Sequence, residues 1–262
     1  MEGTRGERPS WELASVRNAA RLLREFSRTD RELGISELSR RLGLATSTVH
    51  RMVATLAAER LLERGSAKGS YRLGLALYDL GANVGPHLDL HEAAMPVMAT
   101  LRHSTGETVQ LAVLDGLEAV YIDRLESPYT ERIFARVGTR LPATTTSTGK
   151  VLLAALEPAE LDARLRHWRP RRHTPFSIID QGTLRARLAE VAERGWAENR
   201  EESRVGVVSV GAPVRDADGE VIAALSVAAP TDRANAAQRA RLRTAVVDAA
   251  AVISRRLGRS AG

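Results

Sequence analysis

Apolar residues between positions 16 and 56 recur at three- and four-residue steps, the spacing that lines one face of an α-helix. The first such stretch, Val16–Phe26, predicts a helix that packs against the two that follow it. The second helix is predicted to end at Leu42, because Gly43 tolerates the positive φ that a tight turn needs. The stripes of the second and third helices consist of Ile35, Leu38 and Leu42 and of Val49, Val53 and Leu56.

Two short helices joined by a glycine-containing turn describe a helix-turn-helix. Ser36 is expected to cap the first of the two helices, and Thr46 or Ser47 the second. A helical hairpin in some other α domain would show the same pattern and is the alternative interpretation. The polar residues on the open face of the second helix are the candidate DNA contacts: Thr46, Ser47, Thr48, His50 and Arg51.

A predicted β-hairpin follows the helix-turn-helix directly. Its strands are Leu61–Arg64 and Tyr71–Leu73, and the residues between them have turn composition and include Lys68. A hairpin in this place is the wing of a winged-helix domain, with Lys68 as a candidate phosphate contact. A plain surface hairpin is the alternative, but it would not explain the position directly after the helices.

The next stretch, Leu75–Val84, predicts a linker helix that ends near Gly85 and Pro86. We therefore expect four segments: a flexible arm over 1–12, a winged helix over 13–74, a linker over 75–86 and a second domain over 87–262.

Beyond the linker, short apolar strands alternate with amphipathic helices, which predicts an antiparallel α+β domain. The turn Asp115-Gly116 joins two of the strands as a hairpin. The expected strands are Thr108–Leu114, Ala119–Leu125, Arg132–Val137, Val207–Val214 and Val221–Ala228. The expected helices are His91–Arg102, one within Thr144–Leu156, Pro158–Arg166, Leu184–Arg194 and Gln238–Leu257.

The net charge of +6 is unevenly placed along the chain. Residues 1–72 hold 14 Arg or Lys against 9 Asp or Glu, whereas the remainder holds 24 against 23. Excess positive charge on the candidate DNA-binding part favours binding to phosphates. A pure interaction module would leave both this placement and the wing unexplained.

Other features of composition limit the class of protein. The chain has no cysteine, and no apolar run approaches the roughly 20 residues of a membrane span. The first ten residues carry four charges, which argues against a signal peptide. We expect a cytoplasmic protein that has no membrane partner and uses no cofactor or metal.

A run of hydroxyl side chains, Thr144–Thr148, precedes an apolar helix. Hydroxyls and free N–H groups at a helix N-terminus form an anion site, so a small organic acid is the expected ligand. Its carboxylate would sit at Ser147, Thr148 and Gly149, and Ser226 could face the same space. The alternative is that the run only caps its own helix.

Ser147 and Lys150 also spell S-x-x-K, the nucleophile motif of serine β-lactamases. A Ser-Lys hydrolase is therefore an alternative function. The companion K-T-G motif does not occur, because the only lysines, Lys68 and Lys150, precede Gly69 and Val151. We expect that the protein is not an enzyme.

Several blocks together resemble the IclR family of bacterial transcriptional regulators, from about Ser15 to Leu257. They are SVRNAARLL, LSRRLGLATSTVHRMVATL, YRLG, TGETVQLAVLDGLEAVYID, VGTRLPATTTSTGKVLLAAL, RGWAENREES and VGAPVRDADGEVIAALSVAAP. The resemblance implies a winged helix-turn-helix, a linker helix and a GAF-like α/β effector-binding domain. It also implies a homodimer or homotetramer that represses, or less often activates, a catabolic or small-molecule-responsive operon.

The positions that form the effector pocket in this family have counterparts in this chain, and none of these counterparts is Arg or Lys. Some members have cysteine in place of Ser209 and an acid in place of Asn199, so the identity of the effector does not follow. The expected partner of the winged-helix domain is double-stranded operator DNA. We expect the operator to be an inverted repeat that binds two copies of the protein, because one winged helix buries little surface on DNA. The effector-binding positions are Leu141, Ser147, Thr148, Gly149, Asn199, Val207, Ser209 and Ser226.

Overall fold

The structure, a computed structural model, describes residues 13–26, 30–82, 86–129 and 137–260. Contacts between residues divide the chain into two compact units, Met1–Gly85 and Pro86–Gly262. The segment expected as a flexible arm, 1–12, lies outside the described residues.

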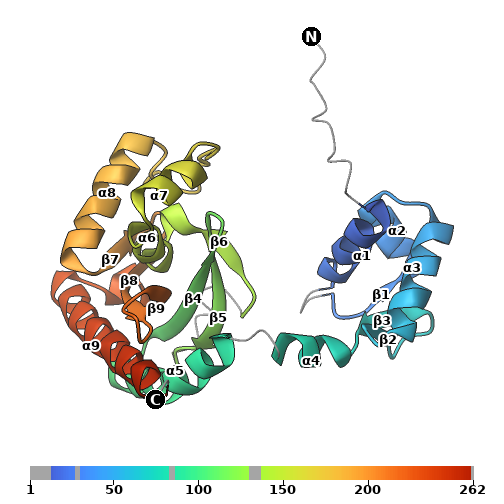
Figure 1. The fold of residues 1–262 in the computed structure, drawn as a ribbon, viewed down its shortest axis with the longest axis horizontal. Helices are drawn as coiled ribbons and strands as arrows, with labels where there is room; N and C mark the ends of the chain where they lie inside the picture. Colours follow the sequence, from blue (N-terminus) through green and yellow to red (C-terminus); the bar gives the residue numbers. More distant parts are fainter. Residues whose placement is uncertain (1–12, 27–29, 83–85, 130–136, 261–262) are drawn as a thin grey trace, which may run out of the picture. The chain divides into compact units, whose positions relative to one another are not determined.

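The first unit holds a helix-turn-helix and a small antiparallel sheet with the strand order β1-β3-β2 (Figure 1). The predicted winged helix is therefore confirmed. The elements are α1 (Ala14–Arg24), β1 (Leu33–Gly34), α2 (Ile35–Leu42), α3 (Thr46–Ala58), β2 (Leu62–Arg64), β3 (Ser70–Leu73) and α4 (Ala76–Ala82).

The apolar stripes predicted for the three helices form the core of this unit. Leu22 of α1, Leu38 of α2, and Val49 and Val53 of α3 are fully buried and belong to one cluster. Gly43 ends α2 in the left-handed conformation, with φ of 66°, as its position predicts.

The predicted helix caps are wrong. The N-cap of α2 is Gly34, so Ser36 lies inside the helix, and the N-cap of α3 is Ala45. Neither cap uses a side chain. The Ser39 hydroxyl instead donates to the Leu44 carbonyl at 2.6 Å and lies 3.3 Å from the hydroxyl of Thr46. A hydroxyl of the preceding helix therefore provides the hydrogen bond that a backbone carbonyl of the turn needs.

The second unit is built on a six-stranded sheet in the order β6-β5-β4-β9-β8-β7, with every neighbouring pair antiparallel. The predicted α+β class is confirmed. The strands are β4 (Thr108–Asp115), β5 (Glu118–Leu125), β6 (Arg140–Pro142), β7 (Ala197–Arg200), β8 (Val207–Arg215) and β9 (Val221–Pro230). The helices are α5 (Pro86–Thr105), α6 (Ser147–Ala154), α7 (Pro158–Leu165), α8 (Gln181–Arg194) and α9 (Ala236–Ser260), with 3-10 turns at Ala143–Thr145 and Thr231–Arg233.

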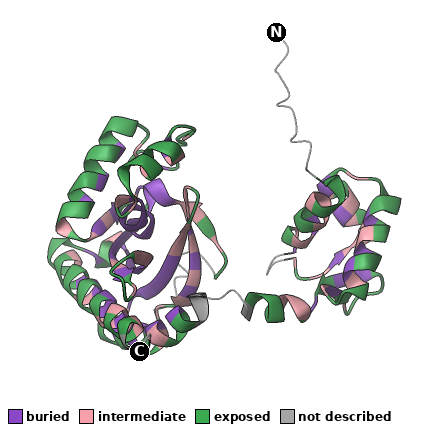
Figure 2. Ribbon diagram, in the orientation of Figure 1, coloured by how far each residue is buried: buried purple, intermediate pink, exposed green. Residues whose placement is uncertain are grey.

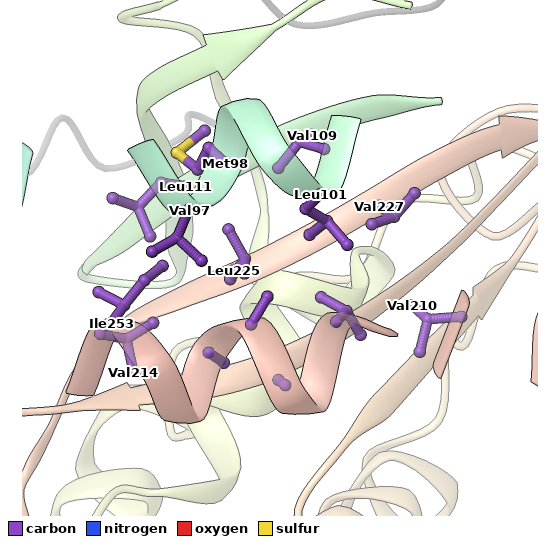
Figure 3. Packing of buried hydrophobic residues seen from close by; sticks show 14 of the residues in the cluster. Val97, Met98, Leu101, Val109, Leu111, Val210, Val214, Leu225, Val227 and Ile253 are labelled. Atoms are coloured by element: carbon purple, nitrogen blue, oxygen red, sulfur yellow. The ribbon is translucent and has the colours of Figure 1, made fainter. Parts of the chain in front are cut away.

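Helices cover both faces of this sheet, so its central strands are buried while the outer helix surfaces face solvent (Figures 1 and 2). On one face, α5 and α9 pack on alternate residues of β4, β8 and β9. Figure 3 shows this core, in which Met98 of α5 and Ile253 of α9 meet Leu111 of β4 and Leu225 of β9. The intervening residues of the same strands face α6.

One expected strand of this unit falls mostly on residues that the structure does not describe, and one observed strand was not predicted. Most of the strand expected over Arg132–Val137 lies outside the described residues, and β6 at Arg140–Pro142 is the strand that pairs with β5. The strand β7 was not predicted. The apolar helix expected within Thr144–Leu156 is confirmed as α6, which follows a 3-10 turn and starts at Ser147.

Within the described residues, no helix is both long enough and apolar enough to cross a membrane.

Candidate DNA interface and effector site

The structure places the predicted DNA contacts of α3 together on one exposed face. Val49 and Val53 turn inward and are fully buried, which leaves the opposite side of the helix open to solvent. Because residues three and four apart share a helix face, the exposed side chains form one continuous surface. These side chains are Thr46, Ser47, Thr48, His50 and Arg51.

Lys68 is exposed on the turn between β2 and β3, where the wing was expected. A carboxylate that the sequence did not single out holds this turn. Glu32 accepts hydrogen bonds from the N–H of Ser66 at 2.9 Å, the N–H of Ala67 at 3.2 Å and the hydroxyl of Ser70 at 2.8 Å. These donors, the Ser66 N–H foremost, lower the pKa of Glu32 to about 2. The wing is therefore a fixed turn with a cation at its tip.

The candidate effector site begins at the N-terminus of α6. Thr146 is the N-cap, and its hydroxyl accepts a hydrogen bond from the N–H of Gly149 at 3.0 Å. Its carbonyl accepts from the N–H of Lys150. The interpretation of the Ser/Thr run as a helix cap is thus confirmed for Thr146. The first N–H groups of a helix have no partner within it, so those of Ser147 and Thr148 are the candidate anion donors.

The start of α6 lies directly on strand β8. The hydroxyl of Ser147 is 2.7 Å from that of Ser209, and both residues are buried. A Cβ atom added at Gly211 would lie 3.2 Å from the N atom of Thr148. A Cβ atom added at Gly149 would lie 2.2 Å from the Cα of Ala143. Helix backbone therefore approaches sheet backbone with no side chain between them.

Strand register shows which residues share this face of the sheet. Gly211 pairs with Ser226, and Ser226 pairs with Gln110 of β4. Gln110 in turn pairs with Arg124 of β5. Because directly opposed residues in antiparallel strands point to the same face, all four lie on the side that α6 covers. Ser226 was a predicted site residue, whereas Gln110 and Arg124 were missed.

Tyr121 joins the same face. The pairing of β4 with β5 shifts between Leu111 and Ala112, so Tyr121 and Arg124 both face α6 although they are three residues apart. The phenol oxygen lies 3.3 Å from the hydroxyl of Thr148. Burial raises the pKa of Tyr121, which keeps the phenol neutral. Leu141 packs in the same small apolar cluster as Tyr121.

The remaining two effector candidates have different surroundings. Asn199 pairs with Ser209 across the strands, but its amide is used within its own loop. Its Oδ1 accepts from the N–H of Glu202 at 2.9 Å, and its Nδ2 donates to the hydroxyl of Ser203 at 3.2 Å. Val207 is buried at the start of β8. Asn199 therefore shapes the loop beside the site.

Lys150 is fully buried, and its ammonium is held away from Ser147 by other groups. It contacts the carboxylate of Glu202 at 2.5 Å and donates to the carbonyl of Glu198 at 2.6 Å. Burial lowers the pKa of the Lys150 ammonium, and the Glu202 carboxylate works in the opposite direction. The lysine thus connects α6 to β7 and to the loop after it. The Ser-to-Lys hydrogen bond that a hydrolase needs is absent among these described contacts.

Comparison with known proteins covers both units. Residues 83–255 match the family domain described as bacterial transcriptional regulator IclR C-terminal, and residues 15–66 match the IclR helix-turn-helix domain. The HTH-type transcriptional regulator XynR of Escherichia coli (strain K12) is 35% identical over 246 residues, covering 94% of this chain and 98% of XynR. The HTH-type transcriptional repressor AllR of the same strain is 31% identical over 212 residues, covering 81% of this chain and 78% of AllR.

Among solved structures, an IclR homologue of Microbacterium hydrocarbonoxydans in complex with 4-hydroxybenzoate has a TM-score of 0.83 at 30% identity. The likeness covers 93% of this chain and 99% of that one. Both units thus match domains of one family. The chain belongs to the IclR family of bacterial transcriptional regulators.

Proposed function

We propose that this regulator is a repressor of a catabolic or small-molecule-responsive operon, released from its operator by a small organic acid. The observation that carries the proposal is the buried contact of Ser147 with Ser209 at the N-terminus of α6. Such a place offers backbone N–H groups, hydroxyls and the positive end of a helix to a carboxylate. The relative that binds 4-hydroxybenzoate, an organic acid, supports this choice.

The site residues have distinct roles in this proposal. Ser147 and Thr148 hold the carboxylate beside Gly149, whose own N–H donates to Thr146, and Ser209 and Ser226 orient the ligand. Leu141 and Val207 cover its apolar body, while Asn199 fixes the adjoining loop.

DNA binding is tested with the intergenic DNA beside the protein's own gene, because local regulators often control adjacent operons. Arg51→Ala should weaken binding by about 1–3 kcal/mol if its guanidinium contacts a guanine. Lys68→Ala should weaken binding to all sequences alike and lower the salt slope by about one. Fluorescence anisotropy at several salt concentrations measures both effects.

The matched control is Arg185→Ala, which removes an equal charge from the surface pair with Asp162 in the second unit. It should leave DNA affinity unchanged. Unchanged affinity in the Arg51 and Lys68 variants as well would refute this DNA interface.

Effector binding is tested by calorimetry with an organic acid and its uncharged amide. The acid should bind more tightly and release the DNA, and a reporter assay then gives the sign of regulation. Rising transcription on release identifies a repressor, and falling transcription identifies the alternative, an activator. Equal affinity for acid and amide would show that the site does not recognise an anion.

Assembly belongs to the same proposal. Two copies are needed to read an inverted repeat, because one winged helix in one major groove provides little specificity. The protein would then act in the cytoplasm as a homodimer or homotetramer, without a membrane, cofactor or catalytic reaction.

A further inference from the structure

Two polar residues on the α6-covered face have no role in the function proposed above. Gln110 is 3% exposed, and its Nε2 has no hydrogen-bond partner among the described residues. The side chain of Arg124, directly opposite on β5, is 4% exposed, and its Nη2 lies 3.9 Å from the carboxylate of the exposed Glu126. An amide donor buried without a partner costs free energy, so its retention points to a ligand that accepts from it.

The position of this pair relative to α6 follows from the strand register. The row runs from Gly211, beneath the start of α6, through Ser226 to Gln110 and then to Arg124. Neighbouring strands lie about 4.8 Å apart, so Gln110 is roughly 10 Å from Gly211 across the sheet. The donors of the helix and the donors of Gln110 and Arg124 therefore stand at opposite ends of one row, with Ser226 between them.

The contact between Tyr121 and Thr148 runs alongside this row. The phenol comes from the same strand as Arg124, and Thr148 belongs to the first turn of α6. The positive charge of Arg124 acts to lower the pKa of the Tyr121 phenol, against the larger effect of burial. Tyr121 and Arg124 are thus neighbours on the face of β5 that α6 covers.

We infer that the effector has two polar ends, a carboxylate at the N-terminus of α6 and a second acceptor group bound by Arg124 and Gln110. This inference rests on the proposed acid effector and narrows its chemical class. A guanidinium binds a carboxylate through two parallel hydrogen bonds, and the amide of Gln110 supplies another donor. A second carboxylate suits this end best, and a hydroxyl or carbonyl oxygen can also accept there.

The test compares acids that differ only in their second end. Calorimetry with terephthalate against benzoate, and with succinate against butyrate, provides an aromatic and an aliphatic pair. In the unmodified protein, the two-ended acid of at least one pair should bind about 10-fold more tightly or better, as expected for a charge-assisted contact. Arg124→Met should abolish this preference, and Arg124→Lys should keep part of it because the charge remains.

Gln110→Leu separates recognition from folding. The change removes a buried amide whose Nε2 has no partner among the described residues, so the ligand-free protein should still unfold in one cooperative thermal transition. The preference for two-ended acids should nevertheless decrease. Arg185→Met removes an exposed charge from α8 and should leave the preference intact.

The outcomes distinguish the two proposals. If one-ended acids bind as tightly as two-ended acids, or if Arg124→Met keeps the preference, the inference is refuted and the acid effector stands. If no acid of the panel binds at millimolar concentration, the proposed effector class is refuted, and the inference is refuted with it.

Discussion

Gly149 occupies a place in α6 where only a hydrogen atom fits. A Cβ there would lie 2.2 Å from the Cα of Ala143 and 2.3 Å from its carbonyl oxygen, both backbone atoms that cannot rotate away. Gly149→Ala should therefore destabilise the protein by about 1–3 kcal/mol or more. Urea unfolding followed by circular dichroism measures the change.

Gly258→Ala in α9 is the matched control, because its Cβ would meet the Cα of Ala217 at an ordinary 3.9 Å. That variant should be as stable as the parent or slightly more so. Equal stability of the Gly149 variant would mean that α6 moves freely relative to the turn before it.

Individual site residues could be predicted from sequence only where the local pattern carried the signal. The hydroxyl run before an apolar helix indicated Ser147 and Thr148, and the structure buries both. Gln110 was missed because its importance comes from pairing with Ser226, more than 100 positions away along the chain, and Arg124 was missed because it pairs in turn with Gln110. Alternation along a strand indicates which residues share a face, but it does not reveal the neighbouring strand.

At the scale of elements, the wing depends on one carboxylate. The pKa of Glu32 is lowered from 4.5 to about 2 by donors of the wing turn, so the unfolded chain binds this proton more readily than the folded chain. Its stabilising contribution is complete above pH 4.5 and is lost as the pH falls towards 2. Glu32→Gln should therefore lower the melting temperature at pH 6, and the difference from the parent should shrink steadily as the pH falls from 4.5 through 2.

Glu63→Gln provides the control, since Glu63 has equal charge and pairs with Arg72 on the exposed surface of the wing strands. It should cause a smaller change at pH 6. A pH-independent effect of Glu32→Gln would contradict the role of charge in holding the wing.

The helices and the longer strands were easier to predict than the short strands or the caps. The expected ends of β4, β5, β8 and β9 lie within two residues of the observed ends. Long apolar periodicity located α1, α3, α8 and α9 to within a few residues. The strands β1 and β7 are too short, at two and four residues, to show an alternation of their own. They form because a longer neighbour, β3 or β8, offers free backbone groups, which is information from the tertiary fold.

For the whole molecule, the exposed apolar residues of α1 and of the segment around α4 predict self-association. Val16 is 63% exposed, Leu75 72% and Tyr78 75%. Large apolar side chains on such surfaces favour burial against another copy. We expect a dimer at least, and Val16→Glu combined with Tyr78→Glu should shift it towards monomer and weaken operator binding. Light scattering measures the mass.

The control for this surface is Val205→Glu, which alters a similarly exposed apolar residue of the second unit. This variant should self-associate as strongly as the parent protein, because the exposed apolar residues of α1 and of the segment around α4 are unchanged. A monomeric parent protein that binds a single half-site with full affinity would refute the predicted assembly.

The two faces of the central sheet also limit how this protein can diverge. Along β4, Val109 and Leu111 serve the packed core, while Gln110 faces α6. Inserting one residue in mid-strand would turn every following side chain of the strand to the opposite face of the sheet. Polar side chains would then point into the hydrophobic core, and aliphatic side chains would point towards α6. Point substitutions can therefore retune recognition one position at a time, whereas a change in strand length alters folding and specificity together. New ligand preferences in this lineage are expected to arise by exchange of residues such as Gln110 within strands of constant length.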